Sequence, residues 1–338
     1  MDQALPLALT MGDPAGIGGE ITLAAWARLR GSGPAFMALD DPGRLSALAA
    51  RLGWDVRIAE VAGPEEAAAV FAQRLPVMTM RLPVPAEPGR PDPANAPAVL
   101  GAIERAVALA RAGRVGGVVT NPISKATLYR TGFAFPGHTE FLGALTGTSE
   151  PPVMLLASPM LRVVPVTIHV SLRRALDTLT TAEIIRTGLA LARGLQEGFG
   201  IAAPRIAVAG LNPHAGEEGA MGDEEGHLVL PAIEALKARG IDAFGPLPPD
   251  TMFTARARTT YDAALCLYHD QALIPIKTID MDGGVNVTLG LPIVRTSPDH
   301  GTAFGIAGQG VADPGSLIAA LRLAAEMAAR RNMKAVAK

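Results

Sequence analysis

Short apolar runs alternate along the chain with longer stretches in which apolar residues recur at helical spacing. The runs predicted as strands cover residues 6–11, 115–120, 153–158, 161–169, 205–214 and 262–270. Because these runs are apolar throughout rather than at alternate positions, they are typical of strands that are covered on both faces. The stretches predicted as helices include 98–113, 181–200 and 316–331.

Residues at the ends of two of these helices fit the preferences of helix termini. Thr180 or Thr181 is the predicted N-cap of the helix 181–200 and Gly198 its predicted end, whereas Ser316 is the predicted cap of the last helix. Strands that alternate with helices favour an α/β fold with a largely parallel sheet. The proline-rich segment 81–98 is predicted to be a surface loop within a lobe.

Composition and charge exclude several classes of protein. The 338 residues carry 30 basic and 32 acidic side chains, so nothing in the charge indicates a nucleic-acid or membrane partner. No apolar run approaches the ~20 residues that span a bilayer, and the N-terminus does not resemble a signal peptide. A single cysteine, Cys266, excludes an internal disulfide. We therefore expect a soluble, cytoplasmic protein.

Three histidines each follow an apolar run that is predicted as a strand. They are His169, His214 and His269. In an open parallel sheet, side chains just beyond the carboxyl ends of the strands converge on one crevice. Three imidazoles with a position left open match a catalytic zinc ion or a similar divalent ion. One such histidine alone is more often a hydrogen-bonded structural residue, so this hypothesis rests on the repeated placement.

Two charged neighbours of these strands have simpler interpretations. His227 lies in a charged stretch and is predicted to be solvated. Asp270 directly follows His269, and its carboxylate has three open interpretations: a partner that orients an imidazole, a general base, or a helix cap.

Polar residues in two glycine- and proline-rich segments are suited to binding an anion. In the segment 120–143 they are Asn121, Ser124, Lys125, His138 and Thr139, and in the segment 275–305 they are Lys277, Asn286 and Arg295. Such cations and neutral donors can replace the hydration of a phosphate or carboxylate. A solvated surface position is the alternative for any one of these cations. Lys277 and Arg295 nevertheless lie in apolar surroundings, where an unpaired cation is costly.

The glycine-rich segment 11–20, MGDPAGIGGE, follows a predicted strand and precedes a helix. It resembles a phosphate-binding turn, but its spacing does not match. A dinucleotide fingerprint that begins at Gly16 and Gly18 needs a third glycine at position 21, which is Ile21, and the Gly-Lys-Ser/Thr of a P-loop is absent.

A set of motifs spread over the chain resembles one enzyme family. The motifs are MGDPAGIGGE, TNPISKATL, PGHTEFL, TIHVSL, GLNPHAGE, GPLPPDTMF, YHDQALIP and VNVTLGLPIVRTSPDHGTAF. They resemble the 4-hydroxythreonine-4-phosphate dehydrogenases of pyridoxal phosphate biosynthesis, from about residue 5 to about residue 330. The first motif and SPDHGTAFGIAGQGVADP are also similar to the wider isocitrate and isopropylmalate dehydrogenase fold, which binds its nicotinamide cofactor without a Rossmann fingerprint.

The resemblance implies a two-lobed α/β/α fold with the active site in the cleft between the lobes. Residues 1–130 and 275–338 would form an outer lobe with the cofactor loop. Residues 131–274 would form a central lobe that binds the metal and forms the dimer.

The resemblance also implies a role for each candidate residue. His169, His214 and His269 would hold one divalent ion (zinc, magnesium or cobalt), with ligands shared between the two subunits of a homodimer. The residues that would contact the substrate are His138, Thr139, Lys277, Asn286 and Arg295. Those that would line the adenosine side of NAD or NADP are His300, Gly301, Thr302 and Ala303. Asp270 and Lys277 are the candidates for the general base.

The implied reaction is the oxidation of 4-phosphohydroxy-L-threonine. A metal that polarises the secondary hydroxyl would ease hydride transfer to the nicotinamide. The product, 2-amino-3-oxo-4-phosphooxybutanoate, is a β-keto acid and would lose CO2 to give 3-amino-2-oxopropyl phosphate. Contacts to the remote phosphate would hold the hydroxyl at the metal.

Two departures from the related patterns bear on specificity. Gly305 stands where the isopropylmalate-type loop commonly has an aspartate that binds the adenosine ribose, so a repulsion against the 2′-phosphate of NADP is lost. Gln309 is neutral and supplies no replacement cation, so we expect a preference for NAD. After His169 the chain reads VSLRRALDTL where the family often has PLxDVP, and Arg173 and Arg174 are expected to alter the rim of the site.

Other functions share parts of this pattern. A related dehydrogenase of a four-carbon sugar-acid phosphate (D-threonate or D-erythronate 4-phosphate), or of an aromatic cis-dihydrodiol, would keep the histidines and differ in its phosphate contacts. A metal-dependent aldolase or epimerase would not need the cofactor loop that begins at His300. A non-catalytic anion-binding protein would have no reason to gather three histidines.

Overall fold

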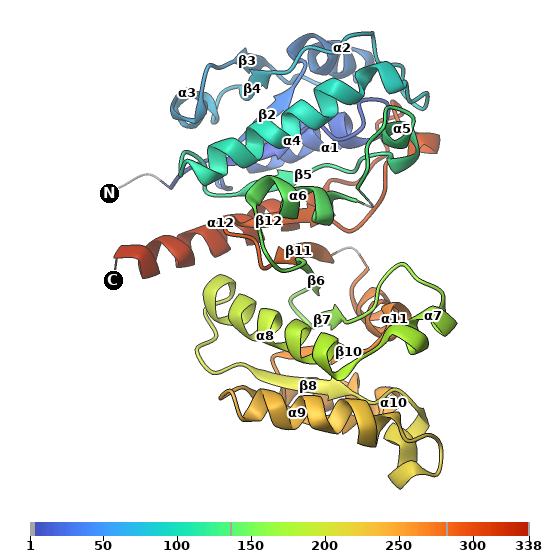
Figure 1. The fold of residues 1–338 in the computed structure, drawn as a ribbon. Helices are drawn as coiled ribbons and strands as arrows, with labels where there is room; N and C mark the ends of the chain where they lie inside the picture. The colour runs from blue at the N-terminus through green and yellow to red at the C-terminus, as the bar shows by residue number, and fades with distance from the viewer. Residues whose placement is uncertain (1–3, 136, 282, 337–338) are drawn as a thin grey trace. The chain divides into compact units, whose positions relative to one another are not determined.

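The computed structural model of the chain describes residues 4–135, 137–281 and 283–336 (Figure 1). It contains two compact units, Met1–Pro152 with Leu291–Lys338 (unit 1) and Val153–Gly290 (unit 2). The expected lobe boundaries at residues 130 and 275 fall earlier than these limits. Residues 131–152 belong to unit 1, where α6 (His138–Thr146) packs against α4 (Ala96–Arg111). Residues 275–290 belong to unit 2, where β11 (Val285–Leu289) pairs with β6 (Val153–Ala157).

The sheet of unit 1 is parallel and buried. Its order is β3 (Ile58–Glu60), β4 (Leu75–Thr79), β2 (Phe36–Asp40), β1 (Leu7–Thr10), β5 (Val118–Thr120) and β12 (Arg295–Pro298). β1 pairs with β2 on one side and with β5 on the other, with Thr10 opposite Thr120. The chain thus turns to opposite sides of β1, and in such sheets ligands bind beyond the carboxyl ends of the strands at this point.

Helices cover both faces of this sheet (Figure 1). α1 (Gly18–Leu29) packs against α2 (Pro42–Leu52) and α12 (Gly315–Val336). On the other face α4 and α6 enclose a core that includes Phe133 and Phe141, whose rings meet edge to face. The shorter helices of unit 1 are α3 (Pro64–Val70) and α5 (Lys125–Tyr129).

The sheet of unit 2 is mixed. Its order is β11, β6, β7 (Arg162–Pro165), β10 (Ala263–Cys266), β8 (Arg205–Ala209) and β9 (Asp242–Leu247). β6 runs antiparallel to β7 and β11, whereas β7, β10, β8 and β9 run parallel to one another. The short connection of residues 158–161 between β6 and β7 makes a hairpin, which requires antiparallel strands.

Helices also flank the unit 2 sheet (Figure 1). α8 (Thr181–Gly198) and α9 (Leu230–Lys237) pack together, and α11 (His269–Ile279) packs on β7 and β10. The remaining α-helices named here are α7 (Leu172–Thr178) and α10 (Pro249–Met252). The central strand β10 is fully buried, and the thiol of Cys266 at its end is 0% exposed. Burial raises the pKa of this thiol.

The observed elements confirm the α/β class and each strand and helix that the apolar pattern predicted. Thr180 is the N-cap of α8, and its Oγ1 accepts a hydrogen bond from the Glu183 N–H at 3.2 Å. The predicted cap Ser316 is wrong, because α12 begins at Gly315 and the Ser316 hydroxyl accepts from the Asp299 N–H instead. Among the described residues, no helix is long and apolar enough to cross a membrane.

Candidate active site

Two histidines lie side by side beyond neighbouring parallel strands of unit 2. His169 follows β7, and His269 is the first residue of α11 after β10. Their ring centroids are 5.7 Å apart. Both rings line a cavity of about 220 Å³, together with Thr167, Tyr268 and Asp270. The strand ends therefore bring these two predicted ligands together.

Asp270 orients the ring of His269. Its Oδ1 lies 2.7 Å from the His269 Nδ1. Because a carboxylate only accepts hydrogen bonds, Nδ1 donates in this contact, and in the corresponding tautomer Nε2 presents its lone pair. Tyr268 holds the N-cap position of α11, so Asp270 is not the helix cap that the sequence allowed. A carboxylate behind an imidazole is the usual support of a metal-binding histidine.

The replacement Asp270→Asn tests this support. We expect the affinity for a divalent ion to fall about 10- to 100-fold, because the amide no longer fixes the tautomer of His269. Competition with a chelating dye measures this affinity. Asp223→Asn is a matched control, since Asp223 lies 3.2 Å from the exposed His227, outside the cavity. Equal affinities of Asp270→Asn and the unmodified chain would contradict the role.

His214 is carried by a loop with an unusual backbone. It follows β8, the other parallel neighbour of β10. The φ angles of residues 214–218 are all positive, 53° at His214 and 42° at Glu217, and His169 has a φ of 50°. A non-glycine residue with a left-handed backbone costs on the order of 1–3 kcal/mol of conformational strain. Such residues cluster at functional sites, where the surrounding contacts hold them in place.

Two buried side chains hold this loop. Oε1 of Glu225 accepts hydrogen bonds from the N–H groups of Leu211 and Asn212, both at 2.7 Å. Burial raises the pKa of the Glu225 carboxyl, but its hydrogen bonds with Asn212 and Leu211 outweigh this and leave the pKa below its usual value. Gln271 accepts from the Leu267 N–H and donates to the Gly210 carbonyl, both at 2.7 Å. Gln271 therefore ties the end of β10 to the end of β8.

A complete three-histidine site does not form within one chain. Among the described residues, no group of three or more His, Cys, Asp or Glu side chains is arranged to hold a metal ion. His214 thus does not join the pair of His169 and His269. The pair itself suits a divalent ion, because it offers two imidazoles, one of them supported by a carboxylate. The metal assignment stays a prediction.

The predicted substrate-binding residues of unit 1 include a buried cation. Arg295 is 3% exposed, and its Nη2 donates a hydrogen bond to the Thr120 Oγ1 at 2.6 Å. Burial lowers the pKa of Arg295 to about 10, so the guanidinium remains charged at neutral pH. His138 begins α6, and its Nε2 is a buried atom without a hydrogen-bond partner among the described residues. Thr139 follows in the first turn. A buried charge beside an unsatisfied imidazole is suited to an anionic ligand.

His138 is held in its neutral form. Burial, with smaller contributions from the charges of Arg295 and Lys125, lowers its pKa well below the usual value. An unfolded histidine titrates near pH 6.5. As the pH falls through that value, the unfolded chain binds a proton that the folded chain does not, so the free energy of unfolding decreases.

Denaturation of His138→Gln checks this consequence. Between about pH 7.5 and about pH 5.5, we expect the free energy of unfolding to fall less in the variant than in the unmodified chain, because glutamine does not titrate. Urea unfolding at a series of pH values measures the difference. Identical pH profiles would show that His138 takes up a proton in the folded state.

The other two predicted substrate contacts belong to unit 2. Asn286 lies in β11 opposite Leu156, and its Oδ1 is buried without a hydrogen-bond partner among the described residues. Lys277 lies in the last turn of α11. Two other polar residues of the segment 120–143 have structural roles. Ser124 caps α5 by accepting from the Thr127 N–H, and Asn121 is bonded inside unit 1.

The predicted cofactor loop is anchored to the glycine-rich segment at the start of α1. The Thr302 carbonyl accepts a hydrogen bond from the Ile17 N–H at 3.0 Å. The carboxylate of Glu20 accepts hydrogen bonds from the N–H groups of Gly308 and Gly310. Ala303 has a φ of 44°, which marks a tight local turn. The segment MGDPAGIGGE therefore supports the loop of residues 300–310.

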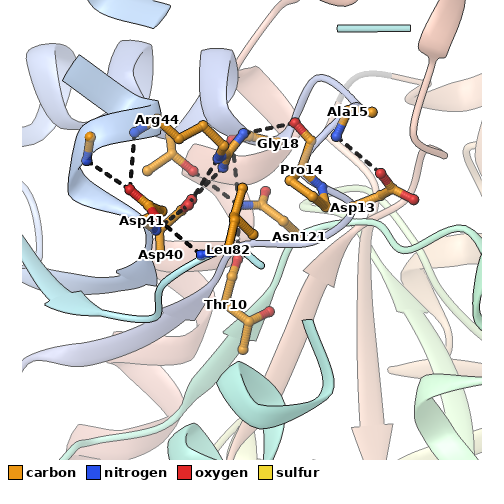
Figure 2. Close-up of polar contacts among 12 residues, drawn as sticks. Thr10, Asp13, Pro14, Ala15, Gly18, Asp40, Asp41, Arg44, Leu82 and Asn121 are labelled. Carbon is orange, nitrogen blue, oxygen red and sulfur yellow. Dashed lines mark hydrogen bonds and ion pairs between the residues drawn. The ribbon is translucent and has the colours of Figure 1, made fainter. Parts of the chain in front are cut away.

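A network of polar contacts surrounds the segment MGDPAGIGGE, which supports the cofactor loop (Figure 2). Arg44 donates to the Asp40 carboxylate from Nε at 3.0 Å and from Nη2 at 2.5 Å, and its Nη1 donates to the Pro14 carbonyl at 2.9 Å. Asn121 Nδ2 donates to the Thr10 carbonyl at 3.0 Å and to the Thr22 hydroxyl at 2.9 Å. These contacts join the ends of β1, β2 and β5 and give the loop a rigid base.

Comparisons with known proteins agree over almost the whole chain. Residues 35–324 match the family model described as pyridoxal phosphate biosynthetic protein PdxA. The chain belongs to the PdxA family. A 4-hydroxythreonine-4-phosphate dehydrogenase of Bradyrhizobium diazoefficiens is 57% identical and aligns with 97% of this chain and 99% of its own. The crystal structure of the enzyme of that name from Klebsiella pneumoniae is 38% identical, with a TM-score of 0.86, and covers 96% of this chain and 98% of its own.

This chain also has a more distant structural neighbour among the solved structures. A terephthalate 1,2-cis-dihydrodiol dehydrogenase from Burkholderia xenovorans is 28% identical, with a TM-score of 0.65, over 96% of this chain and 98% of its own. It is less similar to this chain than the PdxA proteins in both sequence and structure. These matches confirm the expected dehydrogenase fold.

Proposed function

We propose that the chain oxidises 4-phosphohydroxy-L-threonine with NAD or NADP, and that the product loses CO2 to give 3-amino-2-oxopropyl phosphate for pyridoxal 5′-phosphate biosynthesis. The observation that carries the proposal is the 57% identity to a 4-hydroxythreonine-4-phosphate dehydrogenase over nearly the full length of both chains. The histidine pair and the buried cation described above supply chemistry of the required kind.

The residues of this chain that would hold a divalent ion (zinc, magnesium or cobalt) are His169, His214 and His269. When bound, such an ion supplies electrostatic polarisation of the substrate hydroxyl. Because His214 stands apart from the pair within one chain, we propose a homodimer in which the ligands come from two subunits. Asp270 keeps the His269 ring in the tautomer that a metal ion needs.

The phosphate and carboxylate of the substrate would be bound by charged and polar side chains. In unit 1, Arg295 supplies a charged donor, Thr139 a hydroxyl, and His138 a neutral imidazole whose buried Nε2 has no other partner among the described residues. In unit 2, Lys277 supplies an amine and Asn286 an amide. Binding energy from these remote groups holds the reacting hydroxyl in place.

The proton of that hydroxyl must be taken up by a side chain of the protein. Asp270 and Lys277 are the two candidates. The carboxylate of Asp270 is already bonded to His269 at 2.7 Å, which favours an orienting role for it. We therefore assign the proton transfer to Lys277. Lysine side chains serve as general bases when their surroundings favour the neutral form.

The nicotinamide cofactor would bind in unit 1 along the loop that begins at His300. Gly301, Thr302 and Ala303 continue this loop, and the backbone is fixed there by the Ile17 N–H and by Glu20. Fixed backbone groups can receive a dinucleotide at little cost in conformational entropy. The single cysteine, Cys266, is buried, and it supports our expectation of a cytoplasmic location.

An assay of reduced nicotinamide formation tests the proposal. 4-Phosphohydroxy-L-threonine, D-threonate 4-phosphate, D-erythronate 4-phosphate and a cis-dihydrodiol are each offered with NAD and with NADP, with and without a chelator. We expect turnover of the first substrate and its loss with chelator. Turnover of one of the others alone would replace the proposed substrate. No turnover of any would contradict a dehydrogenase, and turnover that resists the chelator would contradict the metal.

A further inference from the structure

A cavity of about 420 Å³ lies in unit 1 between three segments that are distant in sequence. Its walls come from the start of α1, from α2 and from the loop that precedes α4, and Gly308 of the cofactor loop closes one side. Much of the lining is apolar, including Leu48, Leu82, Val84 and Pro88. A cavity of this size with apolar walls is suited to a flat heterocycle such as adenine.

The cavity adjoins the cofactor loop at two points. Gly308 lines it directly. Gly16 also lines it, and a β-carbon at Gly16 would lie 2.8 Å from the Thr302 carbonyl oxygen, so the backbones are in close contact there. A ligand that lies along residues 300–308 would therefore reach the cavity without any change in the backbone.

Most charged side chains in the cavity wall are already paired. Glu20 binds the backbone of the cofactor loop, and Arg44 binds Asp40 and the Pro14 carbonyl. Asp41 accepts hydrogen bonds from the N–H groups at the start of α2 and from Leu82. These groups are committed to holding the walls in place.

Arg51 is the exception in this wall. It lies in the last turn of α2, is exposed, and makes no hydrogen bond or ion pair with any other residue that the structure describes. Its guanidinium reaches the cofactor loop, because a β-carbon at Gly308 would lie 3.5 Å from the Arg51 Cζ. The unpaired guanidinium of Arg51 thus lies beside both the glycine backbone of Gly308 and an apolar cavity.

We propose that Arg51 binds the 2′-phosphate when NADP occupies the cofactor site. The inference rests on the proposed cofactor site. Gly305 in the same loop places no carboxylate against a 2′-phosphate. The sequence offered no replacement cation near that glycine, and the fold supplies one from a helix more than 250 residues earlier in the chain. An arginine fork is the usual partner of a phosphate monoester.

Calorimetric titration of the full-length chain with NADP and with NAD tests the proposal. In Arg51→Ala we expect the Kd of NADP to rise about tenfold and the Kd of NAD to stay the same, since an exposed charge-assisted hydrogen bond contributes roughly 1.4 kcal/mol, or one factor of ten. Arg51→Glu should weaken NADP binding further by repulsion. The NADP preference should also decrease as salt is added.

Two controls separate this contact from general effects on the fold. Arg74→Ala removes another exposed arginine that has no side-chain partner among the described residues and does not line the cavity, and it should change neither Kd. Adenosine 2′,5′-bisphosphate and 5′-AMP serve as probes of the adenosine end alone, and only the first should weaken in Arg51→Ala.

The titrations distinguish a failure of the Arg51 proposal from a failure of the cofactor proposal. If the unmodified chain binds NAD, and Arg51→Ala leaves NADP binding unchanged or weakens both nucleotides equally, the role of Arg51 is overturned while the cofactor proposal stands. If the unmodified chain binds neither nucleotide, the cofactor proposal fails and this inference fails with it.

Discussion

Replacing His269 with alanine is expected to lower kcat/KM at least about a thousandfold, because the change removes a proposed metal ligand and leaves Asp270 without the ring that it orients. His269 is the centre of the arrangement in unit 2: it faces His169 at 5.7 Å and accepts the support of Asp270 at 2.7 Å.

Metal content and activity should fall together in this variant. Elemental analysis of the purified protein gives the metal per chain, and steady-state kinetics gives kcat/KM. His227→Ala is the matched control, because His227 is an exposed histidine that also has a carboxylate partner, Asp223 at 3.2 Å. A His269→Ala protein that kept both its metal and its activity would remove the basis for the assigned centre.

Replacing Arg295 with methionine is expected to lower kcat/KM about a hundredfold or more. The guanidinium is buried and charged, so it can bind the substrate phosphate with little competition from water. Methionine has a similar length and no charge, and it removes a buried cation rather than leaving one unpaired, which limits the cost in stability.

The loss should depend on the phosphate. With 4-hydroxy-L-threonine, which lacks that group, the variant and the unmodified chain should differ little in kcat/KM. Thr120→Val removes the hydroxyl that accepts from Arg295 at 2.6 Å and leaves the charge in place, so its effect on the phosphorylated substrate should be smaller. Equal losses of Arg295→Met on both substrates would show that Arg295 has a structural role only.

Much of the fold follows from the apolar pattern of the sequence. The buried central strands β1 and β10 are continuous apolar runs, and their type was predictable for that reason. The antiparallel direction of β6 was not predictable, because the apolar pattern of a buried strand does not show which strand it pairs with. The N-cap Thr180 was predictable from its hydroxyl, whereas Ser316 has a similar hydroxyl that the tertiary structure uses elsewhere.

The candidate site likewise has features that the sequence predicts and features that it does not. The pairing of His169 and His269 follows from the rule that parallel strands end at one edge. The left-handed backbone of residues 214–218, which includes His214, does not follow from the apolar pattern, because that pattern carries no information about φ. Glu225 and Gln271, which hold the backbone near these histidines, gave no recognisable motif, since their partners are mostly backbone groups. Arg51 was beyond prediction, because its proximity to Gly308 exists only in the folded chain.

The burial of Cys266 has a practical consequence. It is the only sulfhydryl in the sequence, and it lies at the end of the strand that leads to His269. A thiol-specific reagent can reach it only when β10 opens, so the labelling rate under native conditions reports the free energy of that local opening. The natural chain therefore contains a reporter next to its histidines, and labelling with and without divalent ions would measure how strongly ion binding and the folding of this strand are linked.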